Sequence, residues 1–147
     1  MGFALPTAIG AAFANPDKTI LCISGDGGIQ MNIQEFSVLA DYNLNVKVGI
    51  LNNSFLGMVR QWQELFYDHN YSAVELTSPD YKKVAEAYAL PGLKIESKET
   101  LSIHRDHILS KGPVVIDYIV EKEENLFPMV PGGKTLGETI VRAPQPI

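Results

Sequence analysis

The amino-acid sequence predicts an α/β fold, a doubly wound and mainly parallel sheet with helices on both faces. Its candidate strands are short, rich in β-branched residues and apolar at successive positions, which is typical of strands buried on both faces. Segments with apolar residues at helical spacing lie between these strands, so each parallel pair has a helical crossover available. With 147 residues, the chain is long enough for one domain with a sizeable core.

The strands and the first helix follow from local signals. A helix is predicted over Leu5–Ala14, because Pro6 stands near its start and Asn15-Pro16 ends it. Strands are predicted at four apolar runs, namely Thr19–Ser24, Val46–Leu51, Leu93–Ile95 and Val114–Val120.

Four further helices are predicted where apolar residues recur on one helical face. The third of these four begins at Pro79, after the candidate cap Ser78. The faces consist of Ile33, Phe36 and Ala40; Met58, Trp62, Leu65 and Phe66; Tyr81, Val84, Ala85 and Tyr88; and Leu101, His104 and Ile108.

The chain changes character after Val120. The acidic run Glu121–Glu124 is followed by two prolines and a glycine pair, which predicts an extended arm and then a short helix near Leu136–Val141. We therefore expect an α/β domain over residues 1–120, truncated at its N-terminus, and a C-terminal arm of the same domain over 121–147.

Composition narrows the class of protein. Apolar residues make up 46% and charged residues 20%, which is typical of a globular domain. Lys and Arg number 12 against 17 Asp and Glu, and they are scattered, so neither nucleic acid nor a membrane surface is expected as a partner. No apolar run approaches the roughly 18 residues of a membrane span. Cys22 is the single cysteine and cannot form an internal disulfide, so we expect a buried thiol in a cytoplasmic protein.

Unusual polar sequences follow the first two predicted strands. The first strand runs into Gly25-Asp26-Gly27-Gly28, and the second runs into Asn52-Asn53 and the loop up to Gly57. Glycines permit a sharp turn and a close approach of a ligand to the backbone amides. In open parallel sheets, ligands bind beyond the carboxyl ends of the strands. These two loops are therefore the candidate site.

The residue types at this candidate site favour a magnesium-bound phosphate. Backbone amides and a helix start attract phosphate, but Asp26 is an anion and would repel it. A divalent cation between the two removes the conflict, because Mg²⁺ takes one or two protein oxygens together with phosphate oxygens and water. Asn53 supplies a second oxygen from one crossover further along the chain.

Other interpretations of the same residues remain. Taken singly, Gly-Asp-Gly is a common turn and Asn-Asn a common helix cap. A P-loop is excluded because no Gly-Lys-Ser/Thr follows the glycines. A dinucleotide-binding fold is disfavoured because the loop lacks the full G-x-G-x-x-G spacing.

Gly25-Asp26-Gly27 followed by Asn52-Asn53 resembles the thiamine-diphosphate signature of the pyruvate-decarboxylase-like enzyme family. The resemblance extends over nearly the whole chain, including the stretch Met1–Gly10 that precedes the signature. Gly57–Tyr67 (GMVRQWQELFY) and Pro128–Lys134 (PMVPGGK) are similar to the catalytic subunits of acetolactate (acetohydroxyacid) synthases in particular.

The resemblance implies roles for named residues. The side chains of Asp26 and Asn53 and the backbone carbonyl of Phe55 would bind Mg²⁺. Backbone amides for the diphosphate would come from Gly27 and Gly28 of the glycine-rich loop and from Leu56 and Gly57 of the second loop, and Gly25 would also contact the cofactor.

The resemblance also implies an apolar part of the site. Met1 and Met58 would hold the thiazolium and pyrimidine rings of thiamine diphosphate. Trp62 would line the entrance for the second substrate, where inhibitors of the family bind. The alternative for Trp62 is an ordinary helix-core position one turn after Met58.

By the same resemblance, pyruvate would be decarboxylated on thiamine diphosphate, and the resulting carbanion would add to a second 2-keto acid in branched-chain amino-acid biosynthesis. The activating Glu and the FAD-carrying domain of such synthases have no counterpart in this sequence. We therefore expect a C-terminal module of a longer chain, inactive alone. We also expect a dimer or larger homo-oligomer, with a regulatory subunit as a possible further partner.

Two rival functions stay open at this point. One is a sister enzyme with the same cofactor, such as a 2-keto acid decarboxylase, oxidase or carboligase. The other is a non-catalytic binding or assembly module with the same fold. The acidic side chains Glu64 and Asp68, spaced for one helical face, are predicted to be surface charges.

Overall fold

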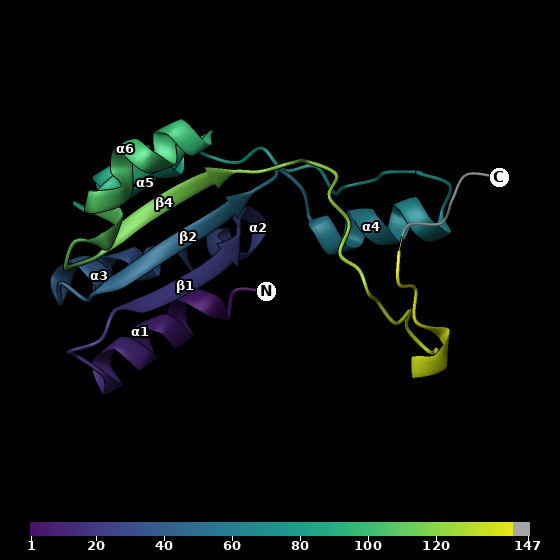
Figure 1. Ribbon diagram of the computed structural model, residues 1–147, viewed down its shortest axis with the longest axis horizontal. Helices are drawn as coiled ribbons and strands as arrows, with labels where there is room; N and C mark the ends of the chain where they lie inside the picture. Colours follow the sequence, from purple (N-terminus) through teal and green to yellow (C-terminus); the bar gives the residue numbers. More distant parts are fainter. Residues whose placement is uncertain (143–147) are drawn as a thin grey trace.

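The computed structural model describes residues 1–142 of the chain. Its centre is a four-stranded, all-parallel sheet in the order β1-β2-β4-β3 (Figure 1). In chain order the elements are α1 (Ala4–Ala14), β1 (Ile20–Gly25), α2 (Asp26–Ile29), the 3₁₀ helix η1 (Gln30–Glu35), α3 (Phe36–Asp41), β2 (Val46–Asn52), α4 (Gly57–Phe66), α5 (Tyr81–Ala87), β3 (Gly92–Ile95), α6 (Lys98–Leu109), β4 (Val114–Ile119) and the 3₁₀ helix η2 (Leu136–Glu138).

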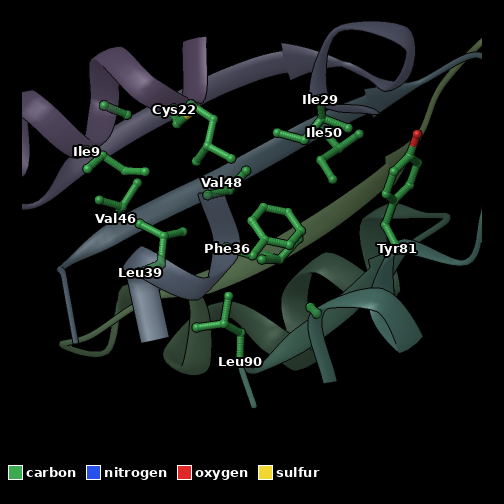
Figure 2. Close-up of a cluster of buried hydrophobic side chains, with 14 of the residues drawn as sticks. Ile9, Cys22, Ile29, Phe36, Leu39, Val46, Val48, Ile50, Tyr81 and Leu90 are labelled. Carbon is green, nitrogen blue, oxygen red and sulfur yellow. The ribbon is translucent and has the colours of Figure 1, made fainter. Parts of the chain in front are cut away.

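Helices lie on both faces of the sheet, which confirms the predicted α/β fold class. The larger apolar cluster packs side chains of α1, α3 and α5 against one face, with Phe36 fully buried at its centre (Figure 2). Val114 and Ile116 of β4 belong to a second cluster, whereas Val115 between them belongs to the first. Because successive strand residues point to opposite faces, the two clusters lie on opposite faces. Ile108 of α6 covers the second cluster.

All four predicted strands are present, and each bound that differs does so by one residue. β1 ends at Gly25 and β2 at Asn52, each one residue later than predicted. Parallel pairing sets Gly25 beside Leu51. The two segments with the candidate site residues therefore leave the sheet side by side at the same edge.

The second predicted helix is not continuous. The face of Ile33, Phe36 and Ala40 is divided among η1 and α3, and Asn32 within η1 has a non-helical φ of −137°. Apolar spacing alone predicted one helix because it carries no information about this break. The first helix agrees with the prediction except that it begins one residue earlier, at Ala4.

The predicted start of the helix at Pro79 is wrong. This helix, α5, begins at Tyr81, and the Asp80 side chain caps it by accepting a hydrogen bond from the Lys83 amide at 3.1 Å. Ser78 does not act as the cap, because its hydroxyl donates to the carboxylate of Asp26 at 2.8 Å. A long-range contact thus replaces the local one that the sequence predicted.

The helix α4 and the arm after β4 extend beyond the carboxyl ends of the strands (Figure 1). Neither contributes a residue to the two apolar clusters. The predicted helix near Leu136–Val141 is only the single 3₁₀ turn η2, because Ile140 is extended and pairs with Met129 through backbone hydrogen bonds of 2.8 and 2.9 Å. Positions 143–147 of the predicted arm lie outside the described residues.

Cys22 is buried in the larger cluster, as the sequence predicts. Burial raises the pKa of its thiol to about 11. Over residues 1–142, no helix is long and apolar enough to cross a membrane.

The close approach of α5 to β3 depends on Gly92. A Cβ atom there would lie 2.5 Å from the Lys82 carbonyl oxygen and 2.9 Å from its Cα. Gly92→Ala is expected to lower the free energy of unfolding by about 1–3 kcal/mol, because the backbone must move. Gly10→Ala in α1 is the control, since nothing lies within 4 Å of its Cβ position. Alanine is the better helix former, so this variant should gain about 0.5–1 kcal/mol. Urea unfolding measures both, and equal midpoints would contradict the packing argument.

Candidate functional site

The carboxylate of Asp26 is the most buried polar group where β1 meets β2. Asp26 is 1% exposed and is the first residue of α2. Its Oδ1 accepts the Gly27 amide at 2.9 Å, and its Oδ2 accepts the Ser54 amide at 2.9 Å and the Ser78 hydroxyl at 2.8 Å. The Tyr81 hydroxyl donates to the Asp26 carbonyl at 3.0 Å. Asp26 therefore holds three chain segments together at the edge of the sheet.

The second loop is fixed by its own amide and by an isolated strand pairing. The Asn53 side-chain oxygen accepts the Phe55 amide at 3.1 Å, and Ser54 between them has a φ of 60°. Phe55 pairs with Glu75 in an antiparallel bridge, in which the Leu56 amide donates to the Val74 carbonyl at 2.8 Å. The loop is therefore an ordered turn next to Asp26.

A cavity of about 440 Å³ lies over these two loops. Its walls are mostly carbon, and Gly27 at the wall has no room for a side chain, since a Cβ would lie 2.8 Å from the Leu56 methyl group. The predicted cofactor residues that line it are Met1, Gly25, Gly27, Gly28, Phe55, Leu56, Gly57 and Met58.

Two of the predicted cofactor-binding residues and the predicted substrate-pocket residue Trp62 lie outside this cavity lining. Asn53 lines a neighbouring hollow of about 730 Å³, which shares Gly25, Phe55 and Gly57 with the cavity. Asp26 lines neither and is buried beneath the loops. The structure thus brings the predicted metal-binding and cofactor-binding residues to one place, at the junction of the two spaces.

Two of the predicted phosphate-binding amides have partners within the protein in this structure. The Leu56 amide is bound to the Val74 carbonyl, and the Gly27 amide points to the Asp26 carboxylate. Gly28 and Gly57 stand in the first turns of α2 and α4, where amides have no intrahelical acceptor. These two amides are the ones that remain for an anionic ligand.

Comparison with known proteins identifies the family. The profile described as "Thiamine pyrophosphate enzyme, C-terminal TPP binding domain" matches residues 1–118. The chain belongs to the thiamine pyrophosphate enzyme family. Thiamine pyrophosphate is the same compound as thiamine diphosphate, so the recognised family and its cofactor agree with those that the sequence motifs indicated.

Curated relatives in this family carry one recurring description. The chain is 47% identical over 145 residues to the acetolactate synthase large subunit of Parasynechococcus marenigrum, covering 95% of this chain and 23% of the relative. It is 43% identical over 138 residues to the acetolactate synthase large subunit of Cyanidium caldarium, covering 92% of this chain and 24% of the relative. It is 41% identical over 142 residues to the acetolactate synthase isozyme 2 large subunit of Escherichia coli, covering 95% and 26%. The chain spans about a quarter of the length of these relatives.

In this thiamine pyrophosphate enzyme domain, helix α4 exposes apolar residues and buries polar ones. Met58, at the cavity, is 46% exposed, and the Trp62 ring lies 5.0 Å from that of Phe66. The buried residues of α4 are instead polar, namely Arg60 and Gln61. Trp62 is therefore not a core residue, which removes the alternative considered for it in the sequence.

Sequence reasoning missed a second buried carboxylate behind the cofactor loops. Asp117 of β4 is 3% exposed, and its Oδ1 accepts the Asn52 side-chain amide at 3.0 Å. Burial raises the pKa of Asp117, and the Asn52 hydrogen bond opposes that shift. The available signal was a lone acidic residue inside the otherwise apolar strand Val114–Ile119. This pair fixes the end of β2 from which the second loop departs.

Asp117→Asn is expected to stabilise the protein at neutral pH. The folded-state pKa lies above the ordinary 3.8, so the native state binds the proton more tightly. Wild-type stability therefore falls as pH rises from 3.8 through the folded-state pKa. Asparagine carries no charge and still accepts from Asn52. Urea unfolding should show a stability gain over wild type that grows between about pH 3 and pH 7.

Asp80→Asn is the control for this pH series. The Lys83 amide lowers the pKa of the exposed Asp80 carboxyl. The Asp80 carboxylate therefore contributes stability above its ordinary pKa, and this contribution is lost as pH falls. This pH dependence is opposite to that of the Asp117 carboxylate. A gain for Asp117→Asn that is independent of pH would contradict the burial argument.

Proposed function

We propose that this chain is the diphosphate- and Mg²⁺-binding domain of an acetolactate synthase catalytic subunit. The observation that supports it most is the joining of both cofactor loops by the buried Asp26 carboxylate, beside a cavity with free helix-start amides. The relatives named acetolactate synthase, at 41–47% identity over 92% or more of the chain, support the choice of reaction.

The donors at this site fit a magnesium ion. Asp26 forms no ion pair within residues 1–142, although burying an uncompensated carboxylate is costly. Its Oδ1 and the Asn53 Oδ1 each accept one hydrogen bond, and an oxygen of this kind has room for a second interaction. The Phe55 carbonyl accepts none in the described part of the chain. A hard cation that prefers oxygen would use these three atoms.

The protein alone would not complete the coordination of that ion. Within residues 1–142, no three His, Cys, Asp or Glu side chains come together as a metal site. Mg²⁺ keeps several positions for phosphate oxygens and water, so the set of Asp26, Asn53 and Phe55 requires a phosphate ligand to accompany it. We infer that the ion and the diphosphate bind together, with the Gly28 and Gly57 amides donating to the phosphate oxygens.

The apolar walls would orient the rest of the cofactor and exclude water. Met1 and Met58 line the cavity, and thioether side chains adapt to irregular shapes. When bound, thiamine diphosphate supplies the stabilised carbanion chemistry that side chains lack. The role of these residues is to keep that centre away from bulk water, where a proton would end the reaction before a second 2-keto acid is bound.

The properties of the whole protein belong to the same proposal. It would take pyruvate and a second 2-keto acid in branched-chain amino-acid biosynthesis, and assemble as a homodimer or larger oligomer in the cytoplasm. A Glu from a further domain would activate the cofactor, and FAD would bind outside this chain. Residues 1–120 would form the domain proper, and 121–147 its arm.

The test of this proposal is the identity of the product. The native protein is incubated with pyruvate, thiamine diphosphate, Mg²⁺ and FAD, and products are identified by mass spectrometry. We expect acetolactate, and Asp26→Ala should weaken Mg²⁺-dependent binding of thiamine diphosphate by more than about 100-fold, since even supporting residues of metal sites contribute 10–100-fold. Acetaldehyde or acetyl phosphate would indicate a sister enzyme. No product would indicate a binding module, and unchanged cofactor affinity in Asp26→Ala would rule out the metal site.

Trp62→Leu is expected to change the preference between pyruvate and a longer second 2-keto acid, and to reduce inhibitor sensitivity, while leaving the Kd for thiamine diphosphate unchanged. The reason is that the Trp62 ring lies on α4, four residues after Met58 at the cavity, and makes no contribution to the apolar core. Competition between the two acids, read from the ratio of products, measures the preference. A loss of stability of about 3–5 kcal/mol would instead mark a core aromatic.

A further inference from the structure

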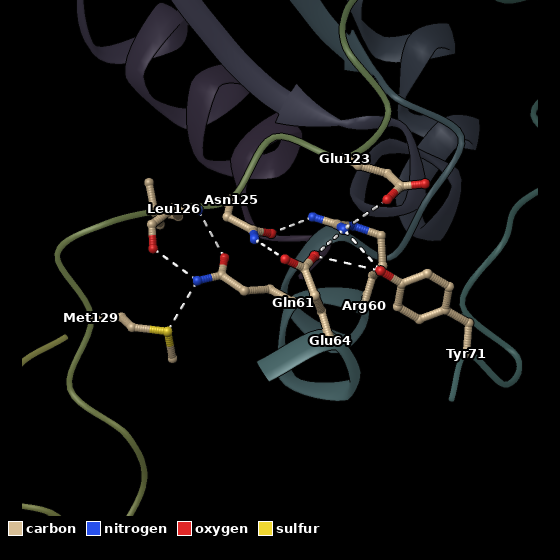
Figure 3. Close-up of polar contacts among 8 residues, drawn as sticks. All are labelled: Arg60, Gln61, Glu64, Tyr71, Glu123, Asn125, Leu126 and Met129. Carbon is tan, nitrogen blue, oxygen red and sulfur yellow. Dashed lines mark hydrogen bonds and ion pairs between the residues drawn. The ribbon is translucent and has the colours of Figure 1, made fainter. Parts of the chain in front are cut away.

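Arg60 is a fully buried charge outside both apolar clusters. Its guanidinium forms an ion pair with Glu64 at 2.6 Å and lies 3.5 Å from the Tyr71 hydroxyl (Figure 3). It also donates to the Asn125 side-chain oxygen, and Glu123 lies 3.7 Å away. Its partners therefore come from α4 itself, from the loop after α4 and from the arm.

The contacts close into a ring that joins α4 to the arm. The Asn125 side-chain amide donates to the second oxygen of Glu64 at 2.6 Å. One residue along, the Gln61 side chain accepts the Leu126 amide at 2.8 Å and donates to the Leu126 carbonyl at 2.9 Å (Figure 3). We call Arg60, Glu64 and Asn125 the Arg60 latch. The prediction of Glu64 as a surface charge is wrong, because its side chain is only 18% exposed and its two oxygens are bound by Arg60 and Asn125.

The latch holds the arm and not the sheet. Residues of α4 and the arm are absent from both apolar clusters, so neither cluster holds these two segments to the domain. A buried guanidinium is costly unless it is paired, and Arg60 Nε has no hydrogen-bond partner among the described residues. Removing Glu64 or Asn125 would leave the buried Arg60 guanidinium with fewer partners, so the three residues act together.

The arm that the latch holds also packs on Trp62. A Cβ atom at Gly132 would lie 3.4 Å from the Trp62 ring, so the arm backbone runs directly against the indole. Arg60 and Trp62 are two residues apart on one helix, and Met58 at the cavity lies one turn earlier. A shift of the arm would therefore free the indole to move.

We infer that Arg60 is a positioning residue for the second 2-keto acid, an inference that rests on the proposed function. By fixing the arm to α4, the latch fixes the Trp62 ring between Gly132 and Phe66 at the substrate entrance. Arg60 is not among the residues that line the cavity, so it acts through Trp62 and not on the substrate. A lysine could pair with Glu64 or Asn125 but lacks the planar fork that reaches both.

The first measurement is amide hydrogen exchange in the native protein with thiamine diphosphate and Mg²⁺ bound. In Arg60→Met, peptides containing Leu126 should exchange about tenfold faster or more, because local opening of the arm no longer breaks the hydrogen bond that the buried guanidinium donates to Asn125. Peptides of β2 should be unchanged. Arg60→Lys should restore part of the protection. The matched control is Lys82→Met, which removes an exposed i,i+4 pair with Glu86 and should leave the arm unchanged.

The second measurement is the product ratio when pyruvate competes with a longer 2-keto acid. Arg60→Met and Asn125→Ala should shift this ratio in the same direction, with a larger rise in KM for the second acid than fall in kcat. Lys82→Met should not shift it.

Three results would overturn the inference. Equal exchange of the arm in Arg60→Met and wild type, or equal acceleration in β2 peptides, would show that Arg60 does not act as a latch. A loosened arm with an unchanged product ratio would remove the positioning role. A wild-type protein that forms no acetolactate would overturn the proposed function and the substrate role with it, whereas the exchange result would still decide whether Arg60 holds the arm.

Discussion

A buried carboxylate with neutral donors is the constraint on which this site depends. Asp26 gathers the starts of α2, of the loop after β2 and of the segment before α5 through donors 2.8–2.9 Å away. Parallel register makes this possible, because it sets Gly25 beside Leu51 and ends both strands at one edge. All three donors are neutral, so the carboxylate is solvated by the protein without being neutralised, and a cation can still bind it. A lysine in the same place would have filled the position proposed for the metal.

The fold could be predicted closely where the physical signal is local. Strands buried on both faces have no polar side to interrupt them, so runs such as Val46–Leu51 show their position directly in the sequence. Prediction failed where a distant residue decides the local structure. Ser78 before Pro79 looks like a helix cap, but its hydroxyl is taken by Asp26, 52 residues away. No local pattern carries that contact.

The same distinction holds for the site. The meeting of the Asp26 and Asn53 loops could be predicted, because their spacing matches one crossover between neighbouring parallel strands. The contact of the Leu56 amide with the Val74 carbonyl could not be predicted, because it belongs to a bridge that forms only after the loop folds back. The hydrogen bonds of Arg60 with Asn125 and of Asp117 with Asn52 each join residues 65 positions apart, so no local pattern names the partner, although Asp117 stands out within its apolar strand.

The orientation of α4 follows from this polar pairing. Apolar contacts are non-directional, so an amphipathic helix packed through Met58 and Trp62 could rotate about its axis at little cost. Arg60 and Gln61 instead contact the arm through hydrogen bonds that have defined directions. Rotation of the helix would break these bonds inside a buried site, where unpaired polar groups are costly. The polar side of α4, with Arg60 and Gln61, therefore fixes the orientation of the helix, and the apolar side remains free to face the cavity.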